Sequence, residues 1–283
     1  MVQESSNFIK TTGATIYFEV GGVPTGIPLI VLHGGPGFDH SYLKTSSVWD
    51  DLGQKRPVIF YDQRGTGQSS IVAEGDSCTF ADQLADLEAL RAHLGYDLID
   101  ILGHSWGGFL GMAYSARHHS RTRRLVLVDS GAPRLQDTVF LFEDIFPETV
   151  DRQKAVAFAE ELGDEDAVQA SIAEYLSMLC YSPENRDSWL SKVDPTIYKH
   201  NVYQVLWNDA KRFDLSPELP KLPQPTMVIT GRYDINVAPS VAYGIHKAIP
   251  GSRFVVFERS GHLPFFEEPD AFKFEIENFL SES

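Results

Sequence analysis

The pentapeptide Gly103–Gly107 reads G-x-S-x-G, and its surroundings constrain the fold more than any other stretch of the chain. An apolar run, Ile99–Leu102, precedes it, and a helix-like stretch, Gly108–Tyr114, follows it. This context predicts a sharp turn from a strand into a helix, which strains the backbone of Ser105 and exposes its hydroxyl at the sheet edge. The flanking glycines would let the strand and the helix approach closely. We therefore interpret Ser105 as a nucleophile rather than as part of a chance pentapeptide in a loop.

Short apolar segments rich in β-branched residues recur on both sides of this turn. Helical periodicity lies between the later ones, as in Phe80–Leu94, where leucines line one face. This alternation predicts an α/β fold with a mostly parallel, doubly wound sheet that is covered on both faces. We predict strands at Ile16–Val20, Leu29–Leu32, Val58–Tyr61, Ile99–Leu102, Leu125–Val128, Thr226–Thr230 and Arg253–Phe257, and helices near Val237–Ile249 and Asp270–Leu280.

The strand signal disappears in the middle of the chain, from Gly131 to Leu222. This stretch is charge-rich and helical in pattern, and it ends at a boundary marked by prolines, Ser216–Pro223. Two helices are expected in it, at Thr149–Leu162 and Glu165–Leu179. We therefore predict an all-helical cap at residues 131–222, inserted into a core made of residues 1–130 and 223–283.

The bulk composition narrows the partners of the chain. Its 283 residues suffice for one large domain with an inserted subdomain. The net charge of −15 disfavours nucleic acids and anionic membranes as partners. No stretch is apolar enough to span a bilayer and the first residues lack a signal-peptide pattern, so we expect a cytoplasmic protein. The two cysteines, Cys78 and Cys180, lack a metal-ligand spacing, and we expect neither a metal nor another cofactor. The sequence leaves the oligomeric state open.

A serine nucleophile needs a general base and an acid that orients the base. Among nine histidines, His262 lies directly after the last predicted strand. Loops after parallel strands meet at the carboxyl edge of the sheet, so we expect His262 to lie near Ser105 as its base. Asp234 follows the preceding strand at the same edge and is the predicted orienting acid. Asp129, which follows Leu125–Val128, is the alternative acid, although a loop-capping role is expected for it.

The tetrahedral intermediate of acyl transfer needs fixed hydrogen-bond donors. One donor is expected to be the backbone N–H of Trp106, the residue after Ser105. The second should come from the glycine-rich loop His33–Gly37, where the N–H of Gly35 is the candidate. His104, inside the pentapeptide, is expected to point away from the position of the base.

Three motifs together resemble those of the proline iminopeptidase family of α/β-hydrolases. They are His33–Gly37 (HGGPG), Tyr61–Ser69 (YDQRGTGQS) and Gly103–Gly108 (GHSWGG). Gly231–Asp234 and Gly261–His262 fit the same pattern, so the resemblance covers the sheet domain and weakens in the cap. It implies a cap over the site and a serine hydrolase that works through an acyl-enzyme. The implied substrates are small amides, first of all N-terminal residues of short peptides or amino-acid amides.

For aminopeptidase members, the resemblance also implies acidic residues that hold the free amino group of the substrate. Relatives carry a glutamate directly after the catalytic aspartate, but this chain has Ile235 there. A cap segment, Trp207–Asp209, resembles a second such region, so Asp209 is the predicted amine ligand. Trp207 and Gly34 are further substrate-binding candidates. A carboxylesterase that acts on small esters is the alternative function, and a ligand-binding protein without turnover is a third hypothesis.

Overall fold

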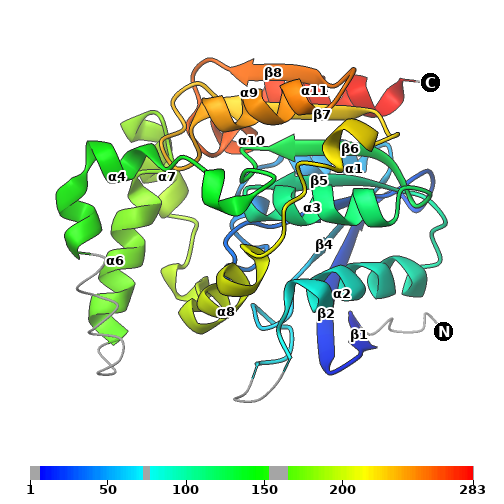
Figure 1. The fold of residues 1–283 in the computed structure, drawn as a ribbon, viewed down its shortest axis with the longest axis horizontal. Coiled ribbons are helices and arrows are strands. Elements are labelled where there is room, and N and C mark those ends of the chain that lie inside the picture. The colour runs from blue at the N-terminus through cyan, green and yellow to red at the C-terminus, as the bar shows by residue number, and fades with distance from the viewer. Residues whose placement is uncertain (1–6, 73–76, 153–164, 283) are drawn as a thin grey trace.

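The computed structural model of the chain describes residues 7–72, 77–152 and 165–282, and one large sheet runs through them. Its eight strands have the order β1-β2-β4-β3-β5-β6-β7-β8 (Figure 1). β2 is antiparallel to both of its neighbours, and all later pairs in this order are parallel. The strands are β1 (Phe8–Thr11), β2 (Ala14–Gly22), β3 (Leu29–Leu32), β4 (Pro57–Tyr61), β5 (Ile99–His104), β6 (Thr122–Val128), β7 (Thr226–Gly231) and β8 (Arg253–Phe257).

The strands β2 to β8 occupy the apolar runs from which they are predicted, and the predicted α/β fold with a mostly parallel sheet is confirmed. β1 is an addition that the sequence pattern does not predict. It is four residues long and only Ile9 in it is buried, so it offers too few apolar positions for a recognisable period. It pairs with β2 through a tight turn, in which Gly13 has a φ of 78°.

Helices cover both faces of the sheet and create two separate cores. On β3, Ile30 and Leu32 belong to one core, whereas Leu29 and Val31 belong to the other. All four side chains of β3 are fully buried, as expected for a central parallel strand. The first core contains residues of α2 (Phe80–His93), α3 (Trp106–Arg117) and α9 (Pro239–Ala248), and the second contains residues of α1 (Val48–Gly53), α10 (Pro264–Glu267) and α11 (Pro269–Ser281).

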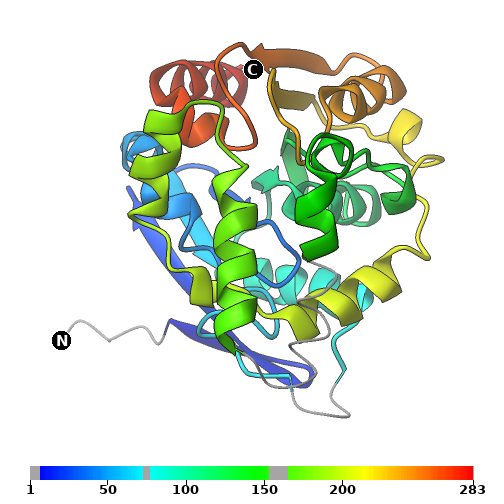
Figure 2. The same cartoon turned by 90° about the vertical axis from the view of Figure 1, so that its left-hand side faces the viewer.

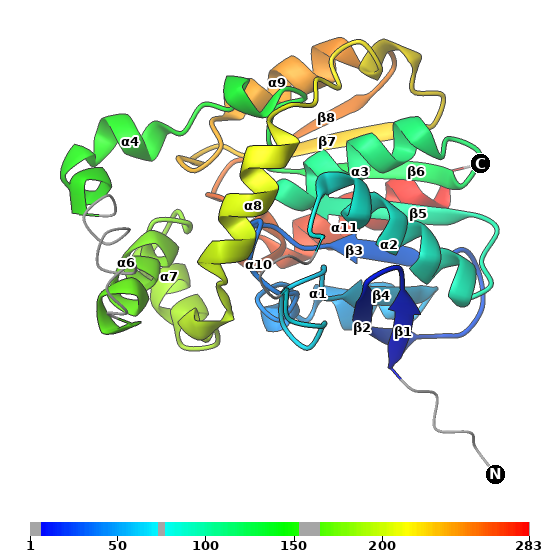
Figure 3. The same ribbon diagram turned by 60° about the horizontal axis from the view of Figure 1, so that its bottom comes forward.

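The segment between β6 and β7, which we call the β6–β7 segment, is helical. It contains α4 (Leu141–Ile145), α6 (Glu165–Ser177), α7 (Pro183–Leu190) and α8 (His200–Ala210). These helices stand beyond one end of the strands in Figures 1 and 3, and Figure 2 shows α6 in light green and α8 in yellow in front of the sheet. α6 matches the predicted helix at Glu165–Leu179. The predicted helix at Thr149–Leu162 falls largely on residues 153–164, which lie outside the described residues.

Different helices of the β6–β7 segment belong to different cores. Leu206 of α8 joins the core of α2 and α3, whereas Leu176 of α6 and Trp189 of α7 join the core of α1 and α11. These helices therefore extend both faces of the sheet beyond the strand ends. Over the ranges that the structure describes, no helix has the length and apolarity needed to cross a membrane.

Candidate active site

Ser105 stands at the sharp turn between β5 and α3. Its φ of 56° and ψ of −119° lie in a region that residues with a side chain rarely adopt, at a cost of about 1–3 kcal/mol. A Cβ on Gly103 would lie 2.2 Å from the carbonyl oxygen of Gly107, and one on Gly107 would lie 2.2 Å from that of Leu32. Only glycine at both positions allows β3, β5 and α3 to pack this closely. The turn places Ser105 in the wall of a cavity between the sheet and the β6–β7 segment, which we call the main cavity because it contains this serine.

His262 and Asp234 form a buried pair in the loops after β8 and β7. The Nδ1 atom of His262 lies 2.7 Å from Asp234 Oδ2, and the two side chains are 3% and 0% exposed. The other carboxylate oxygen, Oδ1, accepts the backbone N–H groups of Asn236 and Val237 at 2.8 and 2.9 Å. Because a carboxylate only accepts, Nδ1 carries a proton and a neutral ring keeps its lone pair on Nε2. This is the tautomer that a general base for serine requires.

The free lone pair of His262 faces an amide rather than the serine. Nε2 lies 3.1 Å from the side-chain Nδ2 of Asn236, whose Oδ1 accepts a hydrogen bond of 2.9 Å from the hydroxyl of Tyr175. Ser105 and His262 both line a second, small cavity of ≈ 20 Å³. Within the described ranges, the hydroxyl of Ser105 makes no hydrogen bond to His262. The structure therefore brings the three predicted residues to one place and leaves the bond between nucleophile and base unmade.

His104 links the loops around Ser105. Its Nε2 donates to the backbone carbonyl of His262 at 2.8 Å, so its Nδ1 accepts from the hydroxyl of Tyr42 at 2.7 Å. Tyr42 in turn accepts the backbone N–H of Gly34 at 2.6 Å. Burial, followed by the neighbouring His262, lowers the pKa of His104 well below its usual value. Because both ring nitrogens of His104 make hydrogen bonds, the neutral ring connects these loops and has no free lone pair with which to act as a general base.

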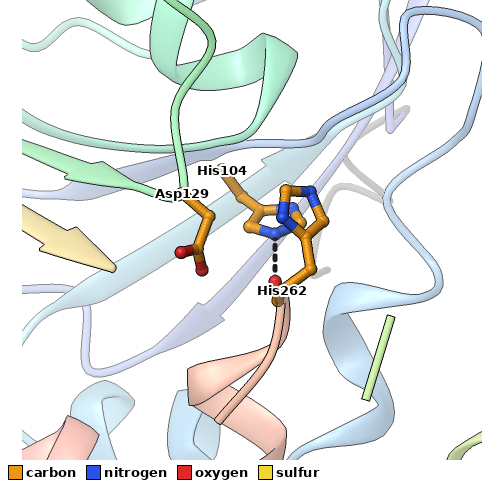
Figure 4. Close-up of side chains that lie close together, drawn as sticks. All are labelled: His104, Asp129 and His262. Atoms are coloured by element: carbon orange, nitrogen blue, oxygen red, sulfur yellow. Dashed lines mark hydrogen bonds between the residues drawn. The ribbon is translucent and has the colours of Figure 1, made fainter. Parts of the chain in front are cut away.

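Asp129 lies beside this group and caps a loop, the role expected for it. Its Oδ1 accepts the backbone N–H of Gly231 at 2.9 Å. Burial, followed by the charge of Asp234, raises the pKa of Asp129 well above its usual range. Figure 4 shows Asp129, His104 and His262 together, and one potential metal-ligating atom from each lies within 4.8 Å of the others. Protein groups already occupy both nitrogens of His104 and the Nδ1 of His262, so these three atoms are not free to bind a metal ion.

Two backbone N–H groups beside Ser105 are available to an oxyanion. The N–H groups of Gly35 and Trp106 make no hydrogen bond to another residue in the described ranges, and both residues line the main cavity together with Ser105. Trp106 is the first residue of α3, where helix N–H groups lack internal partners. The N–H of Gly34, a predicted substrate-binding residue, donates to the hydroxyl of Tyr42. Gly34 also allows close approach, since a Cβ there would lie 3.0 Å from that of Ser105.

Gln63, from the second sequence motif, connects the turn with the glycine-rich loop. Its Oε1 accepts from the indole Nε1 of Trp106 at 2.9 Å, and its Nε2 donates to the carbonyl of His33 at 2.9 Å. The backbone N–H of Gln63 also donates to His33 Nε2 at 3.0 Å. All three residues are buried. This network fixes both N–H donors relative to each other, and sequence reasoning missed it because the motif by itself does not reveal the partners of Gln63.

The main cavity has a volume of ≈ 280 Å³ and lies between the sheet and the β6–β7 segment. Several aromatic side chains line it, and the stacked rings of Tyr203 and Trp207 lie 5.9 Å apart at an angle of 15°. Trp207 thus lines the cavity, as predicted. Glu143, on α4, is the carboxylate among the described lining residues, and its side chain forms no hydrogen bond or ion pair with them. Burial and the nearby charge of Glu143 raise the pKa of Tyr203.

Asp209 does not lie in this cavity, and the predicted contact with a substrate amine needs correction. Its Oδ2 accepts the backbone N–H of Phe80 at 2.8 Å, at the first residue of α2. Its Oδ1 lies 3.8 Å from Arg212 Nη1. Thr79 and Asp82 form a capping box at the same helix end. A carboxylate is stabilised there by unpaired N–H groups and the helix dipole, so Asp209 fastens α8 to α2.

Comparisons with known proteins agree with this arrangement. A sequence model described as alpha/beta hydrolase fold matches residues 27–269. The proline iminopeptidase of Saccharolobus solfataricus is 33% identical, over 99% of this chain and 94% of its own. The proline iminopeptidase of Heyndrickxia coagulans is 30% identical, over 98% of this chain and 99% of its own.

Solved structures with the same fold include esterases. A thermophilic esterase from Thermogutta terrifontis superposes with a TM-score of 0.75 at 27% identity, covering 97% of this chain and 96% of its own. An esterase from a Rhodococcus species has a TM-score of 0.80 at 23% identity, covering 97% and 98%. Because both the family match and the relatives extend over nearly the full length, this chain belongs to the proline iminopeptidase family of α/β-hydrolases and is a serine hydrolase.

Proposed function

We propose that the chain is an aminopeptidase-type serine hydrolase, which releases an N-terminal residue from short peptides or amino-acid amides. The observation that carries this proposal is the position of Ser105 in the wall of a cavity where, among the described lining residues, the one carboxylate is that of Glu143, beside several aromatic rings. A protonated amine is attracted both by a carboxylate and by aromatic faces. The acyl part of the substrate would lie against these groups, with its carbonyl at Ser105.

In the proposed reaction, Ser105 Oγ attacks the substrate carbonyl while His262 Nε2 takes the hydroxyl proton. Asp234 holds the ring through Nδ1 and stabilises the imidazolium. The N–H groups of Gly35 and Trp106 donate to the oxyanion of the tetrahedral intermediate. His262 then gives its proton to the leaving amine as the C–N bond breaks. Water, activated by the same ring, cleaves the acyl-enzyme and regenerates Ser105.

Glu143 takes the role that sequence reasoning gave to Asp209. It lines the cavity, whereas Asp209 is bound to α2. Loss of a charge-assisted contact costs about 1.5–3 kcal/mol, so Glu143→Gln should raise the KM for free-amine arylamides about tenfold or more. Asp209→Asn is the matched control and should leave this KM unchanged.

The decisive measurement compares kcat/KM for prolyl and alanyl arylamides with that for the same compounds carrying an N-acetyl group. We expect N-acetylation to abolish cleavage, because it removes the charge that Glu143 binds. Ser105→Ala should reduce all activity by about 10⁴-fold or more while the chain remains folded. Equal rates on blocked and free substrates would refute the aminopeptidase proposal.

A carboxylesterase for small esters is the second candidate. Two observations favour it: Ile235 follows Asp234, and the described wall of the cavity carries several aromatic and aliphatic side chains but only one carboxylate. An esterase should hydrolyse short-chain p-nitrophenyl esters with a higher kcat/KM than any free-amine arylamide, and Glu143→Gln should leave that activity unchanged. The same panel of substrates therefore separates the two functions.

A further inference from the structure

The side chain of Asn236 lies between the proposed base and the β6–β7 segment. Its Nδ2 is 3.1 Å from His262 Nε2, and its Oδ1 accepts from the hydroxyl of Tyr175 at 2.9 Å. Nε2 is an acceptor because Nδ1 donates to Asp234, so the amide must present its N–H to the ring. Asn236 is 5% exposed, so solvent has little access to its amide. Both ends of the amide are fixed by specific groups.

The lone pair on Nε2 is also the place to which the proton of Ser105 has to move. The single lone pair on Nε2 cannot accept full hydrogen bonds from both the hydroxyl of Ser105 and the amide of Asn236. In this structure it accepts from the amide of Asn236. We infer that Asn236 is a positioning residue that competes with Ser105 for His262, and that Tyr175 holds it in the competing position. This inference rests on the catalytic roles proposed above for Ser105 and His262.

Tyr175 connects this competition to the cavity. It lies on α6 and lines the main cavity, where its ring stacks on Phe38 at 6.5 Å and meets Phe142 edge-on at 6.2 Å. Phe38 belongs to the loop after β3, and Phe142 to α4. A substrate that packs against Tyr175 shifts the hydroxyl that holds Asn236. The base then turns from the amide to Ser105 when the cavity is filled.

Substitution of the side chain alone tests this inference. Asn236→Ala removes the amide and keeps the backbone N–H that donates to Asp234. Tyr175→Phe keeps the amide and removes the hydroxyl that holds it. The other titratable groups around the ring are unchanged in both variants: Asp234 on Nδ1, His104 with its ring centre 4.7 Å away, and the buried Asp129.

The probe is diisopropyl fluorophosphate, which reports the Ser105–His262 pair without depending on the natural substrate. Ser105 Oγ forms the bond to phosphorus, fluoride leaves, and His262 takes the hydroxyl proton. The second-order rate constant of labelling should rise about threefold to tenfold in Asn236→Ala, the factor for one neutral hydrogen bond. Tyr175→Phe should also raise this rate constant, but by a smaller factor than Asn236→Ala.

The pH profile separates positioning from simple packing. A donor to Nε2 stabilises the neutral ring, so its loss should move the acid limb of labelling to higher pH by about half a unit or more. A rate constant and an acid limb equal to those of the unaltered chain, in a folded variant, would overturn this inference alone. A lower rate with an unmoved acid limb would overturn it as well. Failure of the unaltered chain to be labelled at Ser105 would instead overturn the proposed aminopeptidase reaction at Ser105 together with this inference.

Discussion

The carboxylate of Asp209 accepts a hydrogen bond of 2.8 Å from the backbone N–H of Phe80, the first residue of α2. This contact joins α8 of the β6–β7 segment to the sheet domain. We expect Asp209→Ala to lower the free energy of unfolding by about 1 kcal/mol, as for loss of a helix cap. Chemical denaturation measures this value. A large rise in KM at unchanged stability would contradict the structural role.

The glycines of the turn are expected to be intolerant of even one methyl group. A Cβ at Gly107 would lie 2.2 Å from the carbonyl of Leu32, which is backbone and cannot move aside. Gly107→Ala should therefore destabilise the fold by more than about 3 kcal/mol or prevent expression of folded protein.

Gly244 provides the matched control for that substitution. It lies in α9, and a Cβ there would meet nothing within 4 Å. Gly244→Ala should raise the free energy of unfolding by about 0.5–1 kcal/mol, because alanine favours the helix. Thermal unfolding of the two variants side by side checks both signs, and similar losses in both would contradict the close packing at the turn.

The buried pair of His40 and Asp62 predicts a dependence of stability on pH. Their Nδ1 and Oδ1 atoms lie 2.6 Å apart, and Glu19 lies 3.3 Å from the other ring nitrogen. Burial opposes the charged ring, but the hydrogen bond to Asp62 and the charges of Asp62, Glu19 and Asp39 together outweigh it and raise the pKa of His40. A raised folded-state pKa means that the stabilisation is complete below the unfolded value of about 6.5 and is lost as the pH rises through the folded value.

Unfolding measured from pH 6.5 upward should therefore show a loss of stability that is absent in His40→Gln. Burial lowers the pKa of His33 and of His104. These two rings therefore lower the free energy of unfolding only as the pH falls below about 6.5, where they bind protons in the unfolded chain. A flat profile in the unaltered chain above pH 6.5 would contradict the charged pair.

Local patterns in the sequence predict most of the sheet. The strands β2 to β8 are recognisable because their apolar residues are consecutive and lie next to turn residues. The turn at Ser105 is recognisable for the same reason, since strand, glycines and helix follow one another in the chain. β1 is not predicted from the sequence, because it is short and half exposed.

Contacts between distant segments account for what sequence reasoning missed. Whether Asp209 faces a substrate or a helix depends on the packing of α8 against α2, a separation of 129 residues in sequence from Phe80. The contact of Asn236 with His262 and Tyr175 likewise depends on how α6 lies over the sheet. No spacing within the chain encodes either arrangement, and Glu143 was overlooked because only the folded chain shows which carboxylate lines the cavity.

The two cores of the sheet continue into different helices of the β6–β7 segment, α8 in one core and α6 and α7 in the other. The main cavity is lined by Tyr203 from α8 and Tyr175 from α6, so each of these walls has a different core behind it. The position of each wall therefore depends on the packing of the core that supports it. A change of substrate size could therefore arise from repacking leucines far from Ser105, with every residue that touches the substrate left as it is.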